Sequence, residues 1–146
     1  MVDTFTPVDR INGRINNILQ KGDSMKYDQF IKEVQHKIGF GSKDAALIAT
    51  KATLQTLGER LSQGEEKDVA AQLPRELGQY LKDSHDRKTF GLDEFVERVA
   101  RREGIDSNVA RTHAKGVIGV LHKAVSEGEW DDILAQLPCD MKEFFA

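Results

Sequence analysis

Histidine and cysteine are the side chains of this sequence best suited to metal binding or nucleophilic catalysis, and their spacing favours neither. His113 and His122 are nine positions apart, so on one helix they would point to opposite sides. Cys139 follows Pro138 at an expected helix start, where backbone dipoles could activate a thiol, but no histidine or second cysteine is near it in the sequence. We therefore interpret the histidines as structural and the thiol as buried or incidental. The sequence predicts a protein that is not an enzyme and has no catalytic residue, metal or cofactor.

Residues 39–43, Gly-Phe-Gly-Ser-Lys, place glycines and a lysine before an expected helix, which is the chemistry of a phosphate-binding loop. The full spacing of such a loop is missing, and a related segment later in the chain has Asp106 where Ser42 stands. A carboxylate at that position would repel phosphate. We therefore expect a turn, with Ser42 capping the helix that follows.

Basic side chains gather between residues 98 and 123, whereas the charged residues after 124 are six acids and one lysine. The two regions could neutralise each other across packed helices, or the basic one could meet an acidic partner, and we favour an ordinary solvated surface. Nucleic acid is the acidic partner that we retain as an alternative. The candidate basic face consists of Arg98, Arg101, Arg102, Arg111 and Lys115.

The elements that must position these side chains are helices, and their pattern occurs twice. Apolar residues at helical spacing in residues 54–61 recur in residues 118–125, so each stretch predicts a helix with one face in a core. Ser-Gln-Gly at 62–64 and Ser-Glu-Gly at 126–128 should end these helices, because glycine readily adopts the left-handed conformation found at helix ends. A glutamate follows each glycine, in the first turn of the next expected helix, where the helix dipole favours negative charge.

We interpret the recurrence as a tandem duplication, because fifteen of fifty-five aligned positions are identical when Gly41 is left unmatched. Each repeat also contains Gln-Leu-Pro, whose proline should break or bend a helix and suits the first position of a new one. The predicted fold class is all-α: a duplicated helical bundle in which two pseudo-twofold-related repeats of about four helices join an N-terminal helix. The predicted boundaries are 1–24 for an amphipathic helical extension, 25–82 for repeat 1 and 83–146 for repeat 2, within one compact domain.

Composition sets further limits on function. The chain has 146 residues, of which 31% are charged and 39% hydrophobic, which is typical of a folded domain. Its formal net charge of -3 argues against general nucleic-acid or membrane binding. A single cysteine excludes an intramolecular disulfide, and no apolar run approaches the length of a membrane span, so we expect a cytoplasmic protein.

Residues 25–30 (Met-Lys-Tyr-Asp-Gln-Phe), 57–61 (Leu-Gly-Glu-Arg-Leu) and 71–74 (Ala-Gln-Leu-Pro) resemble the prokaryotic domain-of-unknown-function family 2267 (DUF2267). The resemblance covers about residues 25–146 and implies a small helical protein, often with the repeat doubled. The shared motifs mark helices and turns, so the resemblance implies no substrate, cofactor or catalytic residue.

A non-enzymatic protein-interaction or regulatory module is the function that the sequence favours. The duplication and the extra amphipathic helix suggest binding, and tandem helical units leave grooves that an apolar partner helix could occupy. The expected partner is an unidentified protein or a second copy of the chain, with no membrane. Nucleic-acid binding through the basic face is the alternative.

Overall fold

The computed structural model describes residues 25–39, 42–83 and 88–146, and in these ranges it contains eight α-helices and no strand. The predicted all-α fold class is therefore confirmed. The N-terminal helix expected within residues 1–24 lies outside the described residues.

The helices of the first half are α2 (Tyr27–Ile38), α3 (Lys43–Arg60), α4 (Gln63–Ala71) and α5 (Arg75–Lys82). Those of the second half are α6 (Leu92–Glu103), α7 (Ser107–Ala124), α8 (Glu127–Ala135) and α9 (Cys139–Phe145). Their lengths are 12, 18, 9 and 8 residues in the first half and 12, 18, 9 and 7 residues in the second. The same order of helix lengths thus occurs twice.

The expected glycine ends are found for α2 and α6 but not for α3 and α7. The helices α3 and α7 end at Leu61 and Val125 in extended backbone, and Gly64 and Gly128 lie in the first turns of α4 and α8, because Ser62 and Ser126 cap these helices.

α2 and α6 end at Gly39 and Gly104, with φ angles of 75° and 71°, a left-handed conformation that glycine adopts without strain. The Ser42 side chain accepts a hydrogen bond from the amide of Ala45, as expected of a helix cap. Pro74 precedes the first residue of α5, one position earlier than predicted, because its extended backbone places it at the cap.

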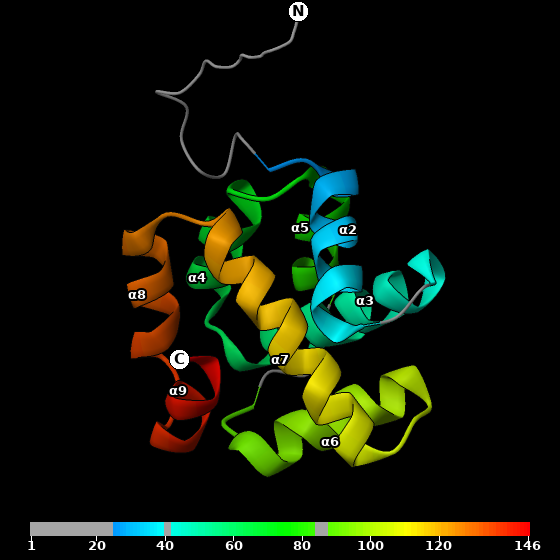
Figure 1. Ribbon diagram of the computed structural model, residues 1–146. Helices are drawn as coiled ribbons and strands as arrows, with labels where there is room; N and C mark the ends of the chain where they lie inside the picture. Colours follow the sequence, from blue (N-terminus) through cyan, green and yellow to red (C-terminus); the bar gives the residue numbers. More distant parts are fainter. Residues whose placement is uncertain (1–24, 40–41, 84–87) are drawn as a thin grey trace, which may run out of the picture.

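Each 12-residue helix packs against the 18-residue helices of both halves. α2 packs against both α3 and α7, and α6 packs against both α7 and α3. Figure 1 shows α7 running diagonally between α2 and α6, with α8 and α9 together at one side. A single cluster of buried apolar side chains includes Phe30 and Leu57 of the first half and Phe95 and Leu121 of the second. The two halves therefore share one core.

A glycine sets the distance between α3 and α5. A Cβ atom at Gly58 would lie 2.2 Å from the carbonyl oxygen of Leu81, so a larger residue could fit only if the α5 backbone moved. The aligned residue in the second half is His122, whose ring stacks on Trp130 at a centroid distance of 4.1 Å. The two halves thus pack their short helices differently.

Within the described ranges, none of the helices has the length and apolar character needed to cross a membrane.

Candidate functional site

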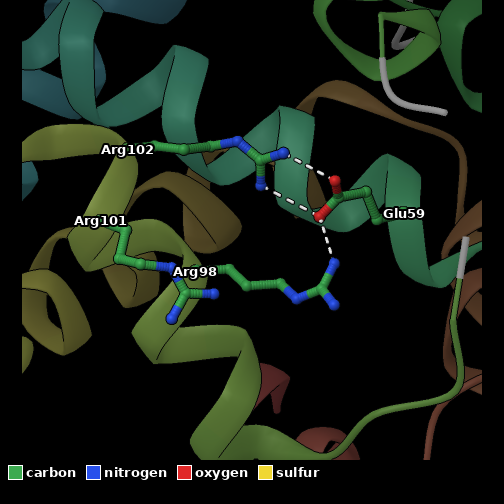
Figure 2. A pocket seen from close by; sticks show the side chains of 4 residues that line it. All are labelled: Glu59, Arg98, Arg101 and Arg102. Carbon is green, nitrogen blue, oxygen red and sulfur yellow. Dashed lines mark hydrogen bonds and ion pairs between the residues drawn. The ribbon is translucent and has the colours of Figure 1, made fainter. Parts of the chain in front are cut away.

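Arg98 and Arg102 on α6 hold one carboxylate of α3 between them. One turn apart, they share a face of α6, and α3 brings Glu59 to that face. Arg98 Nη1 lies 2.9 Å from Glu59 Oε1. Arg102 binds the same carboxylate through two parallel contacts, 3.0 Å from Nη1 to Oε1 and 2.7 Å from Nη2 to Oε2. Figure 2 shows both guanidinium groups converging on Glu59.

The cluster lies mostly out of solvent. Arg98 is 8% exposed and Glu59 is 5% exposed. Burial works to lower the pKa of Arg98, but hydrogen bonds to Glu59 and Glu94 outweigh burial and raise that pKa. The ring of Phe90 lies 4.5 Å from the Arg98 guanidinium carbon, which adds a cation–π contact. These partners satisfy a buried charge that would otherwise be costly.

A cavity of about 320 Å³ opens beside this cluster. Arg101 completes its lining, together with Glu59, Arg98 and Arg102, and we call this site the arginine pocket. Arg101 is exposed and has no hydrogen-bond or ion-pair partner among the described residues. Guanidinium groups bind carboxylates and phosphates through paired N–H donors, so the pocket is suited to an anion.

The other two residues of the candidate basic face lie elsewhere. Arg111 is 3.9 Å from the exposed carboxylate of Asp93. Lys115 donates a hydrogen bond of 3.1 Å to the Phe144 carbonyl and lies 5.2 Å from the centre of its ring. The sequence grouped five basic residues into one face, but the structure brings only Arg98, Arg101 and Arg102 together.

Sequence reasoning missed Glu59 because it belongs to the other half of the chain. A signal for it existed in the repeat alignment, where Glu33 corresponds to Arg98 and Lys123 to Glu59. Lys123 Nζ indeed lies 2.6 Å from Glu33 Oε1, linking α7 to α2. The same inter-helix ion pair is therefore present twice, with its charges exchanged.

The histidines and the cysteine occupy three separate environments. His113 is buried, and its Nδ1 atom lies 2.9 Å from Glu103 Oε1, linking α7 to α6. His122 stacks on Trp130, and Cys139 is exposed at the start of α9. The structure therefore does not bring these residues together.

A second polar cluster was not predicted and lies between α4 and α8. Glu65, Glu129 and Asp132 each offer one carboxylate oxygen, and the three atoms lie within 4.8 Å of one another. Burial, followed by the hydrogen bond and charge of Glu129, raises the pKa of Glu65 to about 8. The sequence explained these glutamates by helix dipoles alone, because the contact between α4 and α8 joins the two halves and leaves no local pattern in either of them.

The fold and the two clusters define an all-α helical-bundle protein with charged sites at contacts between its two halves. The family model described as "Uncharacterized conserved protein (DUF2267)" matches residues 27–144, and the chain belongs to this family. The search of curated proteins found no match.

Proposed function

We propose that this protein is a non-enzymatic protein-interaction module that binds an acidic segment of a partner protein at the arginine pocket. The observation that carries the proposal is the cavity of about 320 Å³ lined by Arg98, Arg101 and Arg102 with only one acidic side chain, Glu59. The setting proposed for this interaction is the cytoplasm of a prokaryote.

The pocket favours a carboxylate-bearing partner because part of it is already ordered. Glu59 fixes the planes of Arg98 and Arg102, so little side-chain freedom remains to be lost on binding. Arg101 stays exposed and can reach a partner directly. An apolar groove is less well supported, since the exposed large hydrophobic side chains in the described ranges are Ile48 and Val109, on different helices.

Tandem duplication is part of the same proposal. Three observations support it. The helix lengths recur in the same order, and α2 and α6 each pack against both α3 and α7. The two inter-helix ion pairs lie at aligned positions with their charges exchanged. In this view, divergence of the two copies exchanged the charges of one ion pair, and the arginine pocket developed in the second copy only.

Fluorescence anisotropy with a labelled oligoglutamate peptide tests the proposed binding. The full chain should bind the peptide at low salt and release it as salt rises, because the contact is electrostatic. Arg101→Ala should weaken binding about tenfold, a loss of about 1.4 kcal/mol. Arg75→Ala is the matched control, since Arg75 is also an exposed helical arginine but lies outside the pocket.

The same titration with DNA distinguishes peptide binding from the alternative function, nucleic-acid binding. A short DNA duplex that binds more tightly than the peptide, and that depends on Arg101, would favour nucleic-acid binding instead. Equal losses with Arg75→Ala and Arg101→Ala would show that attraction is general rather than local to the pocket. Absence of peptide binding at low salt would reject the proposal.

A further inference from the structure

Glu65 and Glu129 face each other across the contact between α4 and α8, although both are acidic and buried. Each is 8% exposed. The nearby charges that act on Glu65 are those of Glu129, Asp132 and Asp68, and all three are negative. The cluster therefore concentrates negative charge around two glutamates that are themselves shielded from solvent.

At the starts of α4 and α8, glutamines from the opposite half accept the hydrogen bonds that these glutamates would usually accept. In the sequence Ser-x-x-Glu, the glutamate normally accepts a hydrogen bond from the backbone amide of the capping serine. Here the Ser62 amide donates to Gln136 Oε1 at 2.8 Å, and the Ser126 amide donates to Gln72 Oε1 at 2.7 Å. Glu129 Oε1 accepts a hydrogen bond of 3.4 Å from Gln72 Nε2, and the Oε2 atom of each glutamate is available for another ligand.

In the described part of the chain, two oxygens of the cluster lack a donor from outside the cluster. Oε2 of Glu65 and Oε2 of Glu129 are buried, and neither accepts a hydrogen bond from a residue outside the carboxylate cluster among the described residues. Buried carboxylate oxygens in folded proteins normally accept a hydrogen bond or bind a cation. The position of these two atoms, in side chains that face each other, points to a ligand with positive charge.

We propose that Glu65, Glu129 and Asp132 form a binding site for a hard divalent cation, with Ca²⁺ as the best-matched ion. The three donor oxygens lie within 4.8 Å of one another, which fits ions that bind oxygen at about 2.3–2.6 Å. Carboxylates are the ligands that such ions prefer, and Ca²⁺ tolerates irregular geometry better than Mg²⁺ does. Asp132 is exposed, so water can complete the coordination from that side.

A bound cation would join the two halves of the molecule. Glu65 belongs to α4, whereas Glu129 and Asp132 belong to α8. A cation would replace repulsion between these helices by attraction, and it would stabilise the folded chain by an amount that grows with the logarithm of the free cation concentration above Kd. This site is separate from the arginine pocket, and its test does not depend on the proposed function.

Calorimetric titration of the chelator-treated full chain with CaCl₂ and with MgCl₂ tests the site, together with thermal unfolding in each salt. The wild type should bind Ca²⁺ more tightly than Mg²⁺, and Ca²⁺ should raise its unfolding temperature. Glu65→Gln and Glu129→Gln should each weaken Ca²⁺ binding at least about tenfold, the scale at which even outer-shell substitutions act. Both variants keep the length and shape of the side chain and cannot carry a negative charge in this buried position, so they should remain folded.

Asp131→Asn is the matched control, because Asp131 is exposed on α8 beside Asp132 but does not belong to the cluster. This variant should bind Ca²⁺ like the wild type. A wild type that binds neither cation would overturn the proposal and would indicate that the two glutamates share a proton instead. Unchanged Ca²⁺ affinity in Glu65→Gln would overturn it equally.

Discussion

Glu59 is the residue on which the arrangement of α3 and α6 depends most directly. Its carboxylate accepts hydrogen bonds from Arg98 and Arg102, which would otherwise repel each other one helical turn apart. A buried ion cluster adds little stability compared with an apolar core, but removal of Glu59 would leave Arg98 with the half-exposed carboxylate of Glu94 as its ion-pair partner. Loss of Glu59 should therefore cost more than loss of an ordinary surface charge.

The substitution Glu59→Ala should lower the free energy of unfolding by about 3 kcal/mol, because Arg98 stays buried without its inter-helix partner. Urea denaturation followed by circular dichroism measures the change. Glu97→Ala, which removes an exposed acid on α6, should alter stability by less than about 0.5 kcal/mol. Similar values for the two variants would show that the ion cluster does not stabilise the fold.

Glu65 should make stability depend on pH in the absence of divalent cations. Its pKa is about 8 in the folded chain against an ordinary value of 4.5, so between these values the folded state holds a proton that the unfolded state has lost. Stability should therefore fall as pH rises through this window. Glu65→Gln should flatten that part of the profile, as measured by urea denaturation in the presence of a chelator, and an unchanged slope would contradict the assignment.

At the scale of elements, the contact between α3 and α5 depends on Gly58. Gly58→Ala should destabilise the protein by about 1–3 kcal/mol, because the new methyl group would meet the backbone of Leu81. Gly64→Ala is the control, since a Cβ atom at Gly64 has no neighbour within 4 Å and alanine favours the helix. Thermal unfolding should show a lower midpoint for the first variant and an equal or higher one for the second.

The helices could be predicted from sequence because their signals are local. Apolar spacing and the glycines at 39 and 104 defined α2 and α6. Ser62 and Ser126 were placed in helix-ending turns, whereas in the structure their side chains cap the starts of α4 and α8. The candidate site could be predicted only in part. Arg98, Arg101 and Arg102 were recognised as basic, but their burial and their partner depend on how α6 packs against α3, which no local pattern encodes.

At the scale of the whole molecule, the shared core should make the two halves unfold together. Trp130 is the only tryptophan and reports on α8, whereas circular dichroism reports on all helices. Gly58→Ala, a change in the first half, should shift the midpoints of both signals equally. A Trp130 midpoint that stays at its wild-type value would show that the halves unfold independently.

The paired glutamines have a consequence for how such a molecule can be assembled. Each half has a serine amide that its own residues do not satisfy, and each carries the glutamine that satisfies the amide of the other. A fragment containing one half would display both groups on one self-complementary surface, which two identical fragments could bury around a twofold axis. Covalent connection of the halves turns that association into an intramolecular step, so closure of the bundle no longer depends on protein concentration.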